Sequence, residues 1–217
     1  MKEKAMKNKS GIHKVQSLYQ KEYSRHGIDP KSLFWPKGRQ ATRFQEHLNT
    51  LQNQCMKNVN NAVIIDYGCG FSDLYKFGVS NQYPNFQYIG VDIVDEFLQV
   101  GKFKYPENRY YLRDEFLRKN EIIGDILIAS GTFNIMYEET YKKNYEFFLR
   151  EIELLSSRIR KCLSIDFMTD EVDYVQSNAF HINPLQLRKD VEKKITARSV
   201  EIIKSKINFE YRIEIWI

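Results

Sequence analysis

The fold of this chain is decided by the stretch Val63-Ile64-Ile65-Asp66-Tyr67-Gly68-Cys69-Gly70-Phe71-Ser72-Asp73-Leu74, together with Tyr88-Ile89-Gly90-Val91-Asp92-Ile93 further along. An apolar run ends in an acid and a Gly-x-Gly turn, and a second apolar run ends in another acid. Glycines let a backbone turn sharply and approach a ligand, while an acid at the tip of the next strand accepts hydrogen bonds from ribose hydroxyls. The pattern predicts a parallel α/β sheet that builds a site for the adenosine half of a cofactor.

The acids beside the turn distinguish two adenosine cofactors, a nicotinamide dinucleotide and S-adenosylmethionine. A dinucleotide lays its pyrophosphate against the turn and the following helix N-terminus, where negative charge from the protein repels it. Here Asp66 precedes the first glycine, and Asp73 takes the place of the third glycine of the G-x-G-x-x-G fingerprint. S-adenosylmethionine has no phosphate and carries a cationic amino group and a sulfonium. Carboxylates around the turn therefore favour S-adenosylmethionine.

With these residues the chain resembles the class I, Rossmann-like, S-adenosylmethionine-dependent methyltransferases from about Val63 to the C-terminus. The resemblance implies that the segment from Asp66 to Ser72 wraps the methionine part of the cofactor and that Asp92 holds the ribose. It also implies that Asp114, the acid after the third strand, lies near the adenine amino group. Ser72 stands where many members have a third glycine. The cofactor-binding residues expected in all are Arg43, Asp66, Gly68, Cys69, Gly70, Asp92, Ile93, Asp114 and Ser130.

Strands alternate with helices from residue 62 onward. We expect strands at 62–66, 86–92, 109–113, 125–130, 161–167, 199–204 and 209–217, and helices at 73–81, 95–103, 138–159 and 184–194. This alternation predicts a seven-stranded, mostly parallel sheet with right-handed crossovers, covered by helices as a three-layer sandwich. The last two strands form a hairpin, which adds an antiparallel strand.

The residues before this alternation divide into two parts. Residues 1–14 are Lys-rich, and we expect them to form a disordered basic tail. Residues 15–58 are expected to form a helical cap segment, with helices over 12–26 and 41–56 and a loop between them. The methyltransferase domain is then expected to cover residues 59–217.

The composition narrows the partners and the compartment. The chain has 217 residues, three cysteines and a formal net charge of +5. The cysteines are widely spaced without a Cys-x-x-Cys pair, which indicates free thiols in a reducing cytoplasm. No apolar run is long enough to span a membrane, and no secretory signal is recognised, so a cytoplasmic protein without a membrane partner is expected. The mild charge makes nucleic acid a disfavoured partner, and a homodimer is left open.

The residues that follow the fourth strand are expected to contact the acceptor. The run Ser130-Gly131-Thr132-Phe133-Asn134 lacks the Asn/Asp-Pro-Pro-aromatic motif of enzymes that methylate exocyclic amines of bases. We therefore expect a hydroxyl rather than a nucleobase amine. Phe133, Asn134 and Tyr137 are expected to wall the acceptor pocket. The alternative, that Phe133 and Tyr137 are ordinary packing residues, carries equal weight.

His181 is the candidate catalytic base, because imidazole ordinarily titrates near neutral pH. Asp166, near the end of the fifth strand, is the alternative base, or a residue that orients His181 or binds a sugar hydroxyl. The competing interpretation of His181 is a loop histidine that faces water. We expect His47 on the polar side of its helix. No cluster of His, Asp and Glu has metal-ligand spacing, so no metal is expected.

A segment before the sheet carries a second resemblance. The run Trp35-Pro36-Lys37-Gly38-Arg39-Gln40-Ala41-Thr42-Arg43-Phe44 resembles a Trp…Gln-x-x-Arg-Phe segment of bacterial class I methyltransferases linked to cell-surface polysaccharide or small-metabolite tailoring. The resemblance implies a helix that covers the cofactor, with Arg43 pairing with the methionine carboxylate. In the alternative, Trp35 and Phe44 only dock the helix while Arg43 faces solvent.

The sequence thus predicts an enzyme that transfers a methyl group from S-adenosylmethionine to a hydroxyl of a small polar acceptor. A sugar or nucleotide-activated sugar is the favoured acceptor. Two alternatives are an RNA methyltransferase that uses the Lys-rich tail for phosphate contacts, and a non-catalytic protein that keeps the fold and binds the cofactor.

Overall fold

A computed structural model describes residues 11–35, 38–52, 61–119, 121–176 and 178–217. The strands are β1 (Ala62–Tyr67), β2 (Phe86–Asp92), β3 (Arg109–Leu112), β4 (Gly124–Ala129), β5 (Ile159–Thr169), β6 (His181–Ile182), β7 (Ser199–Lys204) and β8 (Glu210–Trp216). The helices are α1 (Gly11–His26), α2 (Arg39–Leu51), α3 (Asp73–Ser80), α4 (Asp95–Lys104), α5 (Arg113–Arg118), α6 (Tyr141–Ser156) and α7 (Pro184–Lys194), with a 3-10 helix η1 (Pro30–Leu33).

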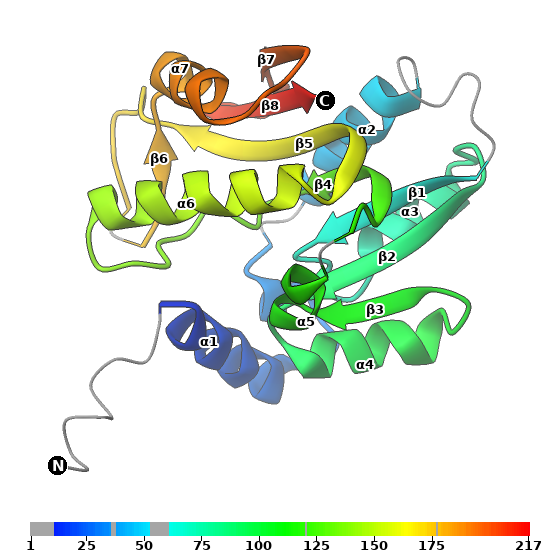
Figure 1. The fold of residues 1–217 in the computed structure, drawn as a ribbon. Helices are drawn as coiled ribbons and strands as arrows, with labels where there is room; N and C mark the ends of the chain where they lie inside the picture. Colours follow the sequence, from blue (N-terminus) through cyan, green and yellow to red (C-terminus); the bar gives the residue numbers. More distant parts are fainter. Residues whose placement is uncertain (1–10, 36–37, 53–60, 120, 177) are drawn as a thin grey trace, which may run out of the picture.

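All the strands lie in one sheet, in the order β3-β2-β1-β4-β5-β8-β7, with the two-residue β6 paired to β5 (Figure 1). The strands from β3 to β5 run parallel, while β8 is antiparallel to both β5 and β7. This confirms the predicted mostly parallel sheet with an antiparallel hairpin at the C-terminus, and β6 is the added strand. The chain order reverses at β1, between β2 and β4, and such a point opens a crevice at the carboxyl ends of the strands.

Helices cover both faces of the sheet because neighbouring residues of each buried strand point to opposite sides. On β1, Ile65 joins a core with Phe148 of α6 and Leu187 of α7. Its neighbour Ile64 joins the opposite core, with Leu48 of α2. Helix α4 packs against β2 and β3 on that second side. The three layers that the sequence predicts are therefore present.

Capping residues set where two of the helices begin. The Thr140 side chain accepts a hydrogen bond from the Lys143 amide (3.3 Å), so α6 begins at 141 and not at the predicted 138. Asn183 accepts from the Gln186 amide (3.0 Å), and Pro184 follows at the first helical position, where its missing N–H costs nothing. Helix α7 accordingly has its predicted bounds.

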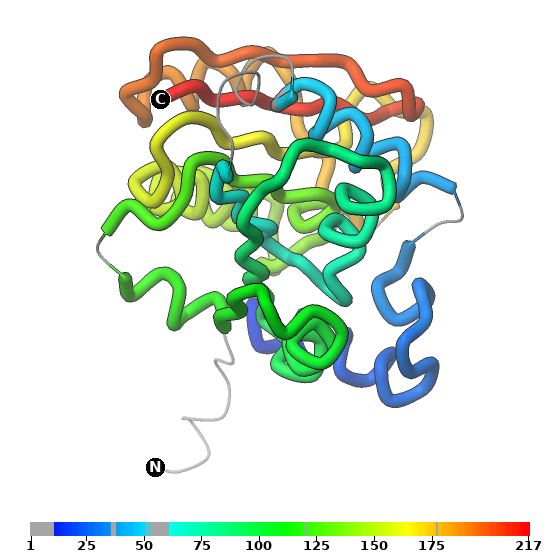
Figure 2. Tube along the Cα trace, turned by 90° about the vertical axis from the view of Figure 1, so that its right-hand side faces the viewer, coloured from blue at the N-terminus to red at the C-terminus, as the bar shows by residue number. Residues whose placement is uncertain are grey.

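The N-terminal elements differ in part from the prediction. Residues 11–14 belong to α1 and not to a tail, while residues 1–10 lie outside the described residues. Helix α2 starts at Arg39 and ends at Leu51, and most of the predicted continuation to 56 lies outside the described residues. Figure 2 shows α1 and η1 (blue) at one end of the molecule, with the C-terminal hairpin (orange to red) at the other. In the described part of the chain, no helix has both the length and the apolar character of a membrane span.

Leu48→Ala should lower the free energy of unfolding by about 2–5 kcal/mol, since a fully buried leucine leaves a cavity when it is truncated. Leu48 is 0% exposed on the face of α2 that packs against the sheet. Gln45→Ala, at an exposed position of the same helix, is the matched control. Denaturant unfolding followed by circular dichroism measures both variants. Equal small losses would mean that α2 is not part of the cooperative core.

Candidate functional site

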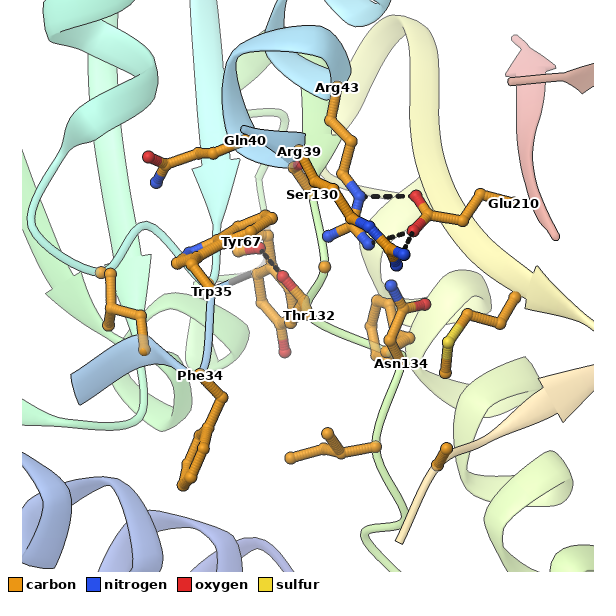
Figure 3. Close-up of a pocket in the computed structure, with 18 of the residues that line it drawn as sticks. Phe34, Trp35, Arg39, Gln40, Arg43, Tyr67, Ser130, Thr132, Asn134 and Glu210 are labelled. Atoms are coloured by element: carbon orange, nitrogen blue, oxygen red, sulfur yellow. Dashed lines mark hydrogen bonds and ion pairs between the residues drawn. The ribbon is translucent and has the colours of Figure 1, made fainter. Parts of the chain in front are cut away.

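A cavity of about 570 Å³ opens at the carboxyl ends of β1, β2 and β4 (Figure 3). Its walls come from the turn after β1, the tip of β2 and the loops after β4 and β5. The amino end of α2 and the start of β8 also line it, as do side chains of α1, α4 and α6. This volume lies in the range of small-molecule sites, which is about 300–1,000 Å³. The cavity is therefore the candidate active site.

The turn after β1 needs its two glycines for conformation and for space. Gly68 and Gly70 have positive φ values of 82° and 50°. A Cβ on Gly68 would lie 2.3 Å from the hydroxyl of Thr132, which donates a 2.6 Å hydrogen bond to the Tyr67 carbonyl. Ser72, where many methyltransferases have a third glycine, adopts the left-handed conformation as a serine, with φ 65°. The predicted glycine-rich loop is thus built without that glycine.

Asp92 ties the tip of β2 to this turn. One carboxylate oxygen accepts a hydrogen bond from the Gly70 amide (2.9 Å), and the other accepts from the Val94 amide (2.9 Å). The side chain lines the cavity and is 8% exposed. Each oxygen keeps a second lone pair, so the carboxylate can hold the loop and accept bonds from a ligand at once. Ile93, the next residue, also lines the cavity.

Asp66 is a second buried carboxylate on the cavity wall. It accepts a 2.7 Å hydrogen bond from the Tyr88 hydroxyl. Burial raises the pKa of Asp66 to about 7, with a further rise from Asp92 and an opposing effect of the Tyr88 bond. Burial also raises the pKa of Asp92 to about 6, although backbone amides partly oppose it. A cationic ligand bound in the cavity beside these two carboxylates would stabilise their ionised forms.

Arg43 enters the cavity from α2 and forms a buried ion pair that the sequence did not predict. Its Nε and Nη2 donate to the two carboxylate oxygens of Glu210, each at 2.6 Å (Figure 3). Trp35 covers the guanidinium at 4.8 Å from the ring centre. No described residue accepts a hydrogen bond from Nη1, which lies against Gly131 at the cavity wall. Arg43 is thus buried and not solvent-facing, and one of its nitrogens is available to a ligand.

Asp166, expected as an alternative base, lies below the cavity and not on its wall. It accepts hydrogen bonds from the Ser130 hydroxyl (2.9 Å) and the Gly131 amide (2.7 Å). Burial alone would raise the pKa of Asp166, but Arg43 and His47 together with the Gly131 amide hold it at about 2. A carboxyl with such a pKa is a weak base, so the structure favours a supporting role for Asp166.

His47 is not on the polar side of α2, and that prediction was wrong. The ring is fully buried, with Nδ1 2.7 Å from the Ser164 hydroxyl and Nε2 3.3 Å from Asp166. A carboxylate only accepts, so Nε2 carries the proton and Nδ1 accepts from Ser164. Burial lowers the pKa of His47 below its ordinary value despite the neighbouring carboxylate. The neutral ring therefore joins α2 to β5.

His181 lines the cavity, at the start of β6. Its Nδ1 lies 2.7 Å from the Thr169 backbone oxygen. Because a carbonyl oxygen only accepts, the neutral ring carries its proton on Nδ1, which leaves Nε2 with a free lone pair. No described residue forms a hydrogen bond with Nε2. The geometry therefore suits a base at Nε2.

Phe133, Asn134 and Tyr137 all line the cavity and are all buried. Phe133 stacks on Tyr67 at 6.0 Å, and the Tyr137 hydroxyl donates to the Thr132 carbonyl (3.1 Å). The two aromatic residues thus serve as packing residues and as cavity wall together. The Asn134 amide nitrogen lies 3.5 Å from Asp166, while its buried oxygen has no partner among the described residues.

The remaining predicted cofactor residues differ in whether they line the cavity. Ser130 lines it, whereas Cys69 is buried outside the lining. Asp114 does not line the cavity, and its side chain is 72% exposed and pairs with Arg113 (2.5 Å). Arg113 itself faces the cavity and pairs with the buried Glu151 of α6. In the described part of the chain, no group of three or more His, Cys, Asp or Glu residues suits a metal ion.

Sequence reasoning missed Glu210 and the Arg113–Glu151 pair, and no local signal could have revealed them. Glu210 lies 167 residues from its partner Arg43, at the start of a strand where a glutamate is usually solvent-exposed. Its burial is tolerable only because the two charges meet in the folded chain.

Comparison with known proteins establishes the fold. No protein-family model and no curated protein matches the chain. The magnesium protoporphyrin IX methyltransferase from Synechocystis PCC 6803, solved with bound S-adenosylhomocysteine, matches with TM-score 0.61 at 13% identity, over 95% of this chain and 99% of that one. A SAM-dependent methyltransferase from Leishmania major matches with TM-score 0.62 at 10% identity, over 99% and 89%. The chain has the class I methyltransferase fold. A family 2 O-methyltransferase from Planctomyces limnophilus, in complex with apigenin, matches with TM-score 0.60 at 13% identity, over 92% and 65%.

In the ligand-free protein, Asp66 should make the free energy of unfolding fall as pH rises. A carboxyl whose folded pKa exceeds its unfolded value favours folding below the unfolded pKa, and this stability is lost as pH rises through the folded pKa. For Asp66 this loss occurs between pH 3.8, the ordinary pKa of the group, and about pH 7, its pKa in the folded protein. The loss from this residue is at most about 4 kcal/mol.

Asp66→Asn should therefore be more stable than the wild type at pH 8, with a much smaller difference at pH 4.5, near the lower end of this range. Urea unfolding at both pH values measures the difference. Asp95→Asn, at an exposed position on the first turn of α4, is the control and should show no such divergence. Parallel wild-type and Asp66→Asn curves would show that Asp66 is not destabilised by its burial.

Proposed function

We propose that this protein transfers a methyl group from S-adenosylmethionine to a hydroxyl of a small acceptor. The observation that carries the proposal is the pair of buried carboxylates, Asp66 and Asp92, beside the Gly68–Gly70 turn in one cavity. Neither carboxylate pairs with a cation among the described residues. A dinucleotide pyrophosphate would meet two negative groups here, whereas a ligand with a sulfonium and an ammonium would meet complementary charge.

The cavity residues fit S-adenosylmethionine in three places. Asp92, with lone pairs beyond those used by Gly70 and Val94, would accept from the ribose hydroxyls. Asp66 and the glycine turn would hold the methionine part. Arg43, through the Nη1 that Glu210 does not use, would bind the methionine carboxylate. Asp114 stays a prediction as the residue near adenine, because it would have to leave Arg113 to reach the cavity.

S-adenosylmethionine supplies a methyl group that its sulfonium already activates. The protein must then hold the acceptor oxygen in line with that methyl group, which contributes about 7–11 kcal/mol in well-oriented reactions. His181 would take the hydroxyl proton at Nε2, while the Thr169 carbonyl keeps the ring in the required tautomer. Asp166 would fix the Ser130–Gly131 backbone beneath the cavity and would not itself remove the proton.

The acceptor, the cellular location and the oligomeric state of the enzyme are proposals that rest on the sequence. A sugar or nucleotide-activated sugar is favoured by the resemblance of residues 35–44 to polysaccharide-linked or small-metabolite-linked methyltransferases. We likewise propose a cytoplasmic location and leave a homodimer open from the sequence. The alternatives are an RNA methyltransferase whose tail lies outside the described residues, and a cofactor-binding protein without turnover. Release of S-adenosylhomocysteine over a panel of nucleotide sugars, saccharides, small acids and total RNA distinguishes them.

Asp92→Ala should raise the Kd of S-adenosylmethionine about 10- to 100-fold, since it removes hydrogen bonds to a charged acceptor. Isothermal titration calorimetry measures this Kd. Asp92 also holds the Gly70 and Val94 amides, so thermal unfolding must show that the variant is folded. Asp95→Ala is the control, and an unchanged Kd in folded Asp92→Ala would remove Asp92 from the cofactor site.

His181→Ala should lower kcat by about 10²- to 10⁴-fold, the usual contribution of a general base. The Kd of S-adenosylmethionine should change less than about twofold, because His181 is proposed to act on the acceptor alone. Rates are measured as S-adenosylhomocysteine release with an acceptor that the wild type methylates. His26→Ala, at an exposed position outside the cavity, serves as the control. Full activity of His181→Ala would exclude the proposed base.

A further inference from the structure

Apolar side chains form part of the cavity wall near His181. Met168 at the end of β5 lies opposite His181 of β6 in the sheet register. Val172, Ala179 and Ile135 line the same cavity. These segments follow β4 and β5, whereas the carboxylates proposed for the cofactor follow β1 and β2. An acceptor that approaches His181 therefore meets apolar surface beside the polar side chains of Asn134, Asp173 and Gln176.

Exposed aromatic rings stand on the wall of this part of the cavity. Tyr174 is 76% exposed in the loop after β5, and Phe209 is 52% exposed just before β8. Phe34, 46% exposed at the end of η1, also lines the cavity. Large aromatic side chains that are exposed on a cavity wall indicate contact with a ligand that has an apolar face.

Two of these rings are held on a backbone that disfavours them. Phe34 and Phe209 have positive φ values of 54° and 65°, in the left-handed region. A bulky residue rarely adopts this conformation, and such strain concentrates at ligand sites. Phe34 caps the end of η1 and Phe209 lies in the turn before β8, so bulky exposed rings occupy two turn positions on the cavity wall.

The cavity offers little to a diphosphate. Its wall carries three arginines that share two carboxylates of the protein: Arg43 lies 2.6 Å and the half-exposed Arg39 lies 3.6 Å from Glu210, and Arg113 pairs with Glu151. Asp173 adds a further carboxyl group to the wall. Phosphate recognition needs cations or amides that are free to bind it. Much of the positive charge on this wall is thus already paired, which makes a diphosphate a poorer fit than an uncharged acceptor.

An imidazole base is also better suited to take a proton from a phenol than from an aliphatic alcohol. Imidazole ordinarily titrates near pH 6.5 and a phenol near pH 10. An aliphatic hydroxyl is closer to water, whose pKa is about 15.7. Proton transfer to imidazole is therefore much less unfavourable from a phenol.

We infer that the acceptor is a phenol whose ring lies against Tyr174 and Phe209 and whose hydroxyl faces His181, an inference that rests on the proposed methyl transfer. The phenolic oxygen forms a bond to the methyl carbon as the bond between that carbon and sulfur breaks. The electron pair of the broken bond stays on sulfur, and the hydroxyl proton passes to Nε2 of His181. The products are an aryl methyl ether and S-adenosylhomocysteine.

The test compares matched acceptors and matched variants of the full chain. S-adenosylhomocysteine release is measured with 4-methylphenol and 2-naphthol, with 4-methylcyclohexanol as the shape-matched aliphatic alcohol, and with glucose and UDP-glucose. Binding of the two phenols to the S-adenosylhomocysteine complex is measured by calorimetry, which needs no turnover. Tyr174→Ala and Phe209→Gly remove one ring each. Glycine accommodates the backbone at 209, so the second variant keeps the fold.

A phenol should be methylated with at least a tenfold higher kcat/KM than 4-methylcyclohexanol and the two carbohydrates. Each variant should raise the Kd and KM of the phenols about tenfold, with an unchanged Kd for S-adenosylmethionine. Phe103→Ala, which removes an 88% exposed ring outside the cavity, should change none of these values.

Preference for a carbohydrate would overturn the inference, as would phenol constants that neither variant changes. Binding of S-adenosylmethionine without binding or methylation of either phenol would also overturn it while leaving the proposed function intact. Absence of S-adenosylmethionine binding would overturn the proposed function itself, and the inference with it.

Discussion

The carboxylate of Asp166 joins parts of the site that are far apart in the sequence. From β5 it accepts hydrogen bonds from Ser130 and Gly131 in the loop after β4, and it lies 3.3 Å from His47 of α2. An ionised buried carboxylate is stable only with several such partners. Removing any one of them would leave the buried carboxylate short of a hydrogen bond, while Arg43 supplies the compensating positive charge. The placement of α2 and the backbone beneath the cavity are therefore coupled through one group.

The charged side chains of the site therefore fall into two groups. Those near α2 are paired within the protein, and those at the turn after β1 are not. On the α2 side, acids and bases neutralise each other: Arg43 pairs with Glu210, and Asp166 pairs with donors from two segments, α2 and the loop after β4. At the turn after β1, Asp66 and Asp92 have no such cation, and their pKa values are raised. Asp66 and Asp92 thus place uncompensated negative charge in the cavity where the proposed sulfonium donor binds. Binding of that donor would supply the missing positive charge.

The sequence predicted the fold and the carboxylates of the turn because local patterns decide both. Asp66 and Asp92 follow buried apolar runs, and parallel strands bring their carboxyl ends to one edge. The position of His47 could not be read in the same way, since a polar residue on an amphipathic helix is expected to face water. Its burial depends on Ser164 and Asp166, which lie more than a hundred residues away. The ion pair of Arg43 with Glu210 was hidden for the same reason, because its geometry belongs to the tertiary structure alone.

The antiparallel hairpin at the C-terminus has a consequence for the site that a purely parallel sheet could not provide. Parallel strands all end at the edge where the cavity lies, so they contribute residues only from their carboxyl ends. Strand β8 runs the other way and begins at that edge, with Glu210 paired in register to Met168. It therefore brings Glu210, its first residue, to Arg43 and places Phe209, the residue just before it, at the cavity wall. The strand that closes the fold also orients the arginine proposed for the cofactor and carries the ring proposed for the acceptor.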